Sequence, residues 1–258
     1  MCLVGHGYAP MRKCIFCGGR SGSREHVFPA WILQKVKSAK FAGFIGHHKN
    51  LSFDEWITKM VCHGCNTGWM GRMETAICRT LGPMIDDHSI LLDAPQQWAI
   101  AAWSVKTAMT MHSTIHSARP MFYTPEEHRA LMVSSSIPSR TTVFLGRYLG
   151  SPNLGGVAVD FTVREIDRVS ECPVRASTFL FGHLVVQVVT VHATPEYSDR
   201  TILIGCTQGP WDDSLVVCWP TKGRKLYWPP ALAFHEGIEK IEFLVLADRY
   251  MIGREVPL

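Results

Sequence analysis

The sequence contains no long apolar run, and this absence excludes one class of protein. No apolar stretch among the 258 residues reaches the roughly 18 residues that a membrane-spanning helix needs. The first residues also lack the basic segment and apolar core of a secretory signal. We therefore expect no membrane partner and a cytoplasmic location.

Several well-known catalytic motifs are also missing. The chain has no Gly-rich phosphate loop, no Gly-x-Ser-x-Gly and no His-Glu-x-x-His, which argues against P-loop enzymes, α/β-hydrolases and zincin proteases. It shows neither an internal repeat nor a low-complexity segment. A hydrophobic content of 47% with 19% charged residues is that of an ordinary globular protein.

Positive charge is concentrated in the first third of the chain. Residues 1–80 hold 11 Lys and Arg against 4 Asp and Glu, whereas residues 81–258 hold 15 against 18. A nucleic-acid backbone would be attracted to the first part before the second. A basic surface that only contacts solvent would have the same composition, so charge alone does not identify the partner.

The nine cysteines fall into two groups. Cys14 and Cys17 form one Cys-x-x-Cys pair, and Cys62 and Cys65 form another after 44 intervening residues. Two such pairs predict a structural zinc ion held by four thiolates. The others are scattered and odd in number, which favours a reducing cytoplasm over disulfides: Cys2, Cys78, Cys172, Cys206 and Cys218.

Three polar residues lie between or directly after the cysteine pairs. Glu25 and His26 are adjacent, on a segment that predicts a short strand, and Asn66 follows the last cysteine. A carboxylate and an amide oxygen suit a hard divalent cation, and histidine accepts protons near neutral pH. Without the cysteine pairs, the Glu-His dipeptide would be an ordinary polar strand end.

The order Cys-x-x-Cys, Glu-His, Cys-x-x-Cys-Asn resembles the HNH, or ββα-metal, endonucleases. It is similar to recombination endonuclease VII-like and bacterial or phage HNH proteins, and the likeness covers about a quarter of the chain. It implies that Glu25 and Asn66 bind Mg²⁺ or Mn²⁺, that His26 is the general base, and that Asn50 orients His26. The implied reaction is phosphodiester hydrolysis in DNA, with RNA left open, in a phage, mobile-element or defence setting.

The sequence departs from the common family pattern in three places. Glu25 stands where aspartate is usual, and Asn66 takes the place of the final histidine. Asn50 is not fixed by spacing, because the intervening loop is long. Glu74, eight residues after Asn66, either supports the metal ligands or forms a salt bridge on the helix surface, and we favour the salt bridge.

The overall pattern predicts an α+β protein. Residues 1–85 would form a zinc-stabilised, treble-clef-like ββα-metal module, and residues 86–258 a helical segment followed by a mostly antiparallel, β-rich domain. Expected helices cover 31–36, 66–81, 95–117 and 125–133, with residues 82 and 83 ending the second. Expected strands cover 24–28, 142–148, 156–165, 178–192, 201–206, 215–219 and 240–247.

Alternatives to a nuclease remain. The first 85 residues would also suit a catalytically inactive, zinc-stabilised module that binds nucleic acid or protein. A third hypothesis makes residues 95–258 a small-ligand sensor that gates the nuclease. Since one active site cuts one strand, a double-strand break would suggest a homodimer.

Overall fold

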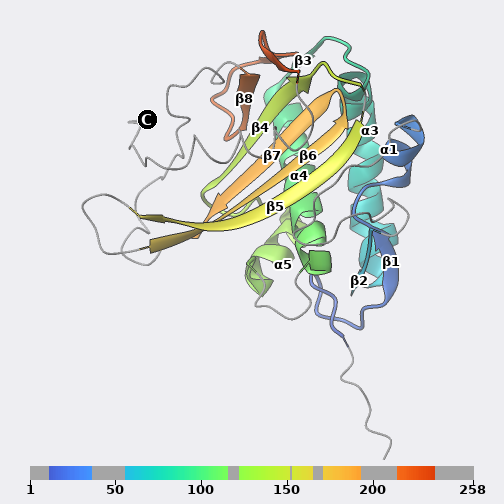
Figure 1. Ribbon diagram of the computed structural model, residues 1–258. Helices are drawn as coiled ribbons and strands as arrows, with labels where there is room; N and C mark the ends of the chain where they lie inside the picture. The colour runs from blue at the N-terminus through green and yellow to red at the C-terminus, as the bar shows by residue number, and fades with distance from the viewer. Residues whose placement is uncertain are drawn as a thin grey trace, which may run out of the picture.

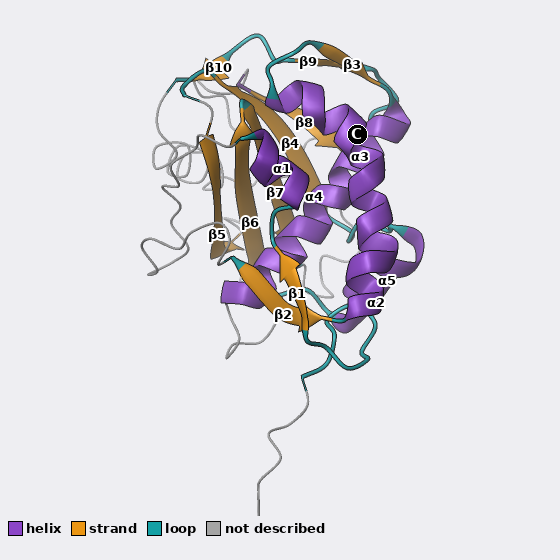
Figure 2. Cartoon of the chain, turned by 90° about the vertical axis from the view of Figure 1, so that its right-hand side faces the viewer, coloured by secondary structure: helices purple, strands orange, loops and turns teal. Residues whose placement is uncertain are grey.

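A computed structural model of the chain describes residues 12–36, 56–115, 122–151, 153–164, 171–192 and 214–235. Helices pack on one side of a large sheet, and a small β-hairpin lies beyond them (Figures 1 and 2). This confirms the predicted combination of helices with a mostly antiparallel sheet.

The described residues form six helical segments and ten strands. The helical segments are α1 (Ala30–Lys35), α2 (His63–Cys65), the π-helical η2 (Asn66–Met70), α3 (Gly71–Ile85), α4 (Ala94–Ile115) and α5 (Pro125–Ser134). The strands are β1 (Ser23–His26), β2 (Ile57–Val61), β3 (Ile90–Leu92), β4 (Thr141–Tyr148), β5 (Asn153–Arg164), β6 (Glu171–Gly182), β7 (Leu184–Val191), β8 (Leu215–Trp219), β9 (Leu226–Trp228) and β10 (Ala233–Phe234).

The main sheet has the strand order β10-β4-β7-β6-β5, and β8 also pairs with β4. The pairs are antiparallel, except that β10 runs parallel to β4. Every residue of β7 is buried. Two smaller sheets pair β1 with β2 and β3 with β9.

The prediction of one strand over residues 178–192 was wrong. The chain turns at Gly182 and His183, so that β6 and β7 form a hairpin. Gly182 has a φ of +61°, and a Cβ there would lie 2.6 Å from the carbonyl oxygen of Ile85. Only glycine suits both conditions, and the continuous apolar run on either side hid this turn.

The predicted end of a helix at residues 82 and 83 was also wrong. Helix α3 continues to Ile85 with Pro83 inside it. Leu81, Met84 and Ile85 are all buried, and this burial outweighs the helix-breaking preference of proline. The short strands β2, β3, β9 and β10 were not predicted. The strands expected at 201–206 and 240–247 lie outside the described residues.

Helix α4 occupies the centre of the molecule. Residues 100–113 are all buried, because the main sheet lies on one side of the helix and α3, α5 and the β1–β2 hairpin lie on the others (Figure 2). A helix enclosed in this way should be apolar around its whole circumference. Its sequence has small hydroxyl residues and His112 among the apolar ones, and Lys106 is the only Lys, Arg, Asp or Glu in this stretch.

Aromatic packing fixes the hairpin against both α4 and the sheet. The ring of Phe28, just after β1, lies 4.9 Å from that of Trp56 and 5.0 Å from that of Phe181 on β6. The indole of Trp56 donates a hydrogen bond of 3.0 Å to Thr114 on α4. A single hydrophobic core therefore contains residues from both sides of residue 85 in the sequence. The division into two modules at that residue stays a prediction.

An ion pair joins the end of α3 to β4. The guanidinium of Arg147 donates two hydrogen bonds, of 2.8 and 2.6 Å, to the carboxylate of Asp87. These hydrogen bonds hold the pKa of Asp87 below its usual value, although burial acts in the opposite direction. A bidentate pair of this kind is more specific in geometry than an ordinary surface pair.

We predict that Asp87→Asn removes part of the acid sensitivity of the fold. Because the folded pKa is lowered, the pair stabilises the protein above the unfolded pKa of about 3.9. That stability is lost as pH falls through the lowered folded value. Urea unfolding near neutral pH should show a loss of about 1 kcal/mol, since both side chains are partly exposed. This loss of stability should vanish at low pH. The exposed residue Glu126, changed to Gln, is the control. An equal loss of stability at both pH values would contradict the predicted role of the ion pair.

Candidate metal centre and the adjoining acid–histidine site

Four cysteines form a cluster beside the β1–β2 hairpin. The Sγ atoms of Cys14, Cys17, Cys62 and Cys65 all lie within 4.8 Å of one another. A tetrahedral zinc site with Zn–S bonds of about 2.3 Å requires sulfurs about 3.8 Å apart. The Sγ atoms of Cys17 and Cys62 are 3.6 Å apart. The predicted cysteines therefore come together in an arrangement able to bind a metal ion such as zinc.

Local backbone geometry forms this cluster from two tight turns. In the first, the amide of Cys14 donates to Gly19 at 2.7 Å and Gly18 donates back to Cys14 at 2.9 Å. Gly18 has a φ of +74°, which glycine adopts without strain. In the second, the thiol of Cys62 caps the helical turn by accepting from the amide of Cys65 at 3.4 Å. Strand pairing then brings the two turns side by side.

The protonation of the thiols is uneven. Burial raises the pKa of Cys65. Burial also acts to raise the pKa of Cys62, but hydrogen bonds from the Cys65 amide and the neighbouring thiols lower it overall. Four thiolates so close together would repel one another, whereas a divalent metal ion stabilises all of them. Metal binding at this cluster should therefore release protons and stabilise the fold.

Glu25 lies on β1 with its side chain enclosed by the protein. It pairs with Thr58 across the hairpin and is only 6% exposed. Burial raises the pKa of its carboxyl to about 7, the positive charge of Lys106 lowers it, and the negative charge of Glu74 raises it. The residue therefore faces α4 and α3. A bound cation near this carboxylate would favour the ionised form, as Lys106 does.

His26 ends β1 and pairs with Ile57. Strand alternation directs it to the opposite side from Glu25, and it is half-buried. Its Nδ1 is enclosed and has no hydrogen-bond partner among the described residues. Asn50, the predicted partner of His26, lies outside the described residues.

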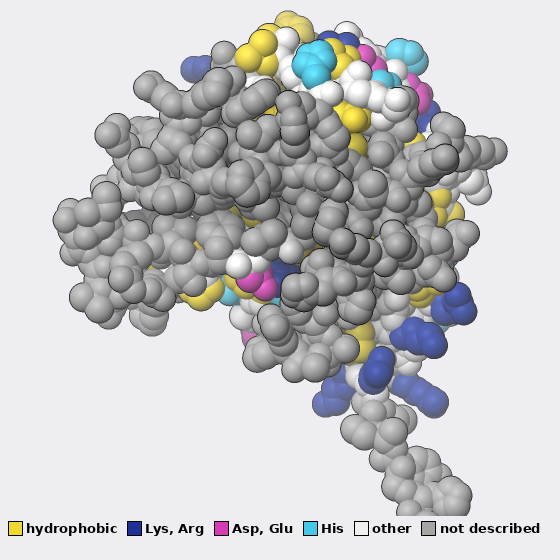
Figure 3. All heavy atoms as spheres, viewed as in Figure 1, with side chains coloured by type: hydrophobic (Ala, Val, Ile, Leu, Met, Phe, Trp, Pro, Cys, Tyr) yellow, Lys and Arg dark blue, Asp and Glu magenta, His cyan; other side chains and the backbone are white. Residues whose placement is uncertain are grey.

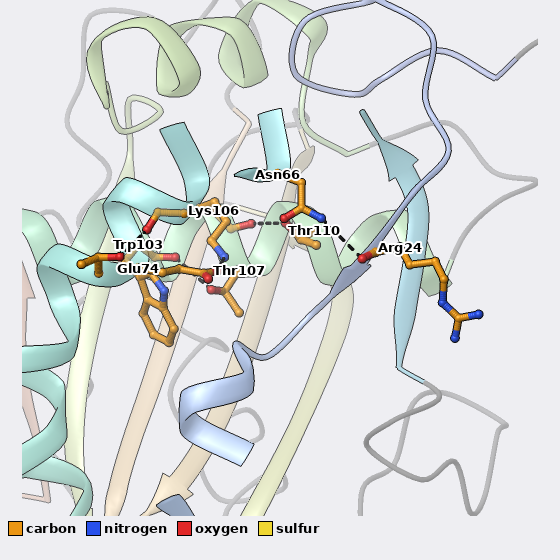
Figure 4. A network of polar contacts seen from close by, with 9 residues as sticks. Arg24, Asn66, Glu74, Trp103, Lys106, Thr107 and Thr110 are labelled. Atoms are coloured by element: carbon orange, nitrogen blue, oxygen red, sulfur yellow. Dashed lines mark hydrogen bonds and ion pairs between the residues drawn. The ribbon is translucent and has the colours of Figure 1, made fainter. Parts of the chain in front are cut away.

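Asn66 links the helical turn after the cysteines to the acid–histidine strand. Its side-chain amide donates to the hydroxyl of Ser23 at 2.9 Å and to the carbonyl of Arg24 at 3.4 Å. Figure 4 shows Asn66 reaching toward the backbone at Arg24, whose guanidinium points away. Strand pairing is irregular between Ser23 and Glu25, beside this contact. The side chain of Asn66 and the strand bearing Glu25 and His26 are thus held together.

Glu74 does not form a surface salt bridge. Its carboxylate accepts from the ammonium of Lys106 on α4 at 2.7 Å, and this lysine side chain is 0% exposed (Figure 4). Lys106 was not among the predicted site residues. A signal was present, because it is the only Lys, Arg, Asp or Glu between Asp93 and Arg119. A buried cation must be paired, so an isolated lysine in an apolar helix points to a carboxylate nearby.

Comparisons with protein-family models, with curated proteins and with solved structures find no match for this chain. The resemblance to HNH nucleases therefore depends on the residues quoted above. Within the described ranges, no helix combines the length and the apolar character needed to cross a membrane.

We predict that Cys65→Ser lowers bound zinc from about one ion per chain to a small fraction of that, and lowers the melting temperature. Loss of one thiolate opens the tetrahedral site, and metal binding contributes to folding. Metal analysis of the purified protein and thermal unfolding would measure both effects. Cys78→Ser, a partly buried cysteine on α3, is the matched control. Equal zinc content in the two variants would refute the assignment.

We also predict strong coupling between Lys106 and Glu74. Glu74→Gln should destabilise the protein by about 3 kcal/mol, because it leaves the buried ammonium of Lys106 without its partner. Lys106→Met should cost less, because the Glu74 carboxylate that it leaves is partly exposed. The double variant should be more stable than the sum of the single effects implies, by about 1–3 kcal/mol. Chemical denaturation of all four proteins completes the cycle. Additive losses would show that the two residues are energetically independent.

Proposed function

We propose that this protein is a metal-dependent endonuclease of the HNH type that hydrolyses phosphodiester bonds in DNA. The observation that carries the proposal is the hydrogen bonding of Asn66 to β1, directly beside the four-cysteine cluster. It supports the proposal because these hydrogen bonds join Asn66 to the strand that bears Glu25 and His26. The cysteine cluster supports this arrangement by holding together the two chain segments that contribute these residues.

The donor set suits Mg²⁺ or Mn²⁺. Glu25 offers a carboxylate, and Asn66 retains its amide oxygen for a cation because its nitrogen donates to β1. When bound, such a cation stabilises negative charge on the phosphate oxygens and the leaving group. Glu74 contributes a second carboxylate near Glu25, and Lys106 holds it in place.

His26 would accept the proton of the attacking water at Nε2, because its Nδ1 is enclosed. Histidine can accept a proton near neutral pH, which suits this role. Its enclosed Nδ1 then needs a hydrogen-bond acceptor to fix the tautomer, and Asn50 is the residue we propose for this.

The buried charge of Lys106 favours a second candidate function, binding without cleavage. Its buried ammonium already offsets the carboxylate charge of Glu74 and Glu25 in the absence of a metal ion. In that case residues 12–85 form a binding module for nucleic acid or protein without cleavage. The two functions differ in whether the protein cuts DNA, since both retain the zinc cluster.

We predict that the purified protein nicks or linearises supercoiled plasmid when Mg²⁺ or Mn²⁺ is added, and not when both are omitted. His26→Ala should reduce the rate by about 10²–10⁴-fold, the usual contribution of a general base. Exposed His88→Ala is the matched control, and zinc content should be equal in both variants. Cleavage that survives His26→Ala would eliminate the proposed mechanism. Absence of cleavage by the zinc-loaded wild-type protein would favour the binding module.

A further inference from the structure

A basic pocket of about 410 Å³ lies next to the cysteine cluster, apart from Glu25 and His26. It is lined by Arg12, Arg20, Ser21, Gly22 and Lys59. These residues come from the first cysteine turn and from the middle of β2. Hydrogen bonds of 3.1 and 2.9 Å from the amide and hydroxyl of Ser21 to the Arg12 carbonyl fix the shape of the turn.

The cations of this pocket are available to a ligand. Arg12, Arg20 and Lys59 are exposed and form no ion pair with any described residue. Lys13 and Arg24 add two more exposed cations to the same part of the chain. Figure 3 shows the dark-blue side chains gathered at the lower right, below the hairpin seen in Figure 1.

In the part of this region that the structure describes, no exposed carboxylate balances this charge. Glu25 is the only acid in residues 12–36 and 56–70, and it is buried. A zinc ion with four thiolates would carry a formal charge of about −2, which the five exposed cations outweigh. A concave surface lined with unpaired cations attracts polyanions and raises their local concentration.

We propose that the pocket of Arg12, Arg20 and Lys59 binds a backbone phosphate of a nucleic acid. Gly22 and His26 are four residues apart along an extended segment, which separates pocket and histidine by roughly 13 Å. The bound phosphate therefore lies a few nucleotides from the phosphodiester bond that would be cleaved with His26 as the base. This part of the inference rests on the proposed function. Guanidinium groups suit this ligand because they donate to phosphate oxygens in pairs.

The test is fluorescence anisotropy with a labelled DNA duplex of about 20 base pairs over about 50–200 mM salt, without Mg²⁺ or Mn²⁺. The triple variant Arg12→Ala/Arg20→Ala/Lys59→Ala should bind at least tenfold more weakly. Its plot of log affinity against log salt should be shallower by about 1, since the loss of one phosphate contact removes about 0.9. The matched control is Arg129→Ala/Lys222→Ala/Lys225→Ala, which removes three exposed cations elsewhere.

An equal loss of DNA affinity in both triple variants would show that only net charge matters and would overturn the proposal. Unchanged DNA affinity of the pocket variant would also overturn it. Inorganic phosphate and vesicles of anionic lipid form two further arms. A pocket variant that loses only vesicle or free-phosphate binding would contradict nucleic-acid recognition. Zinc content and thermal unfolding confirm that both variants fold. Pocket-dependent binding without plasmid cleavage would support the pocket and refute the nuclease.

Discussion

Helix α4 is enclosed over residues 100–113, and the rest of the structure is arranged to cover it. The main sheet buries one side, while α3, α5 and the hairpin bury the remainder. Because no face meets water, the single charge on this stretch needs a partner within the protein. Glu74 on α3 provides it. The pairing of Glu74 with Lys106 therefore fixes α3 relative to α4, and with α3 the helical turn that carries Asn66.

The hairpin is held at both ends by different physical means. At one end, the cysteine cluster joins the turn before β1 to the turn after β2. At the other, Phe28 and Trp56 pack into the apolar core against β6 and α4. Glu25 and His26 lie between these two supports. Such a position is rigid without being fully buried, which is what a reactive site on a protein surface needs.

The features that the sequence predicted well are those set by local spacing. Two Cys-x-x-Cys turns and an asparagine directly after the second define their geometry within a few residues, and the long periodic helix α4 needs no distant information. Features that depend on the fold were missed. The contact of Gly182 with Ile85 and the retention of Pro83 in α3 arise only when separate elements pack together. The partner of Lys106 likewise lies 32 residues away in the sequence.

A helix that is covered on every side has no surface on which sequence change is free. Along α4, a larger side chain collides with a neighbour and a smaller one leaves a cavity, so neutral drift there is slow. The charged pair is the most restricted, because loss of Glu74 leaves the ammonium of Lys106 unpaired in the interior and loss of Lys106 leaves a half-buried carboxylate unpaired. Among related sequences, positions 74 and 106 should therefore covary, replaced together by an apolar pair or retained together as acid and base.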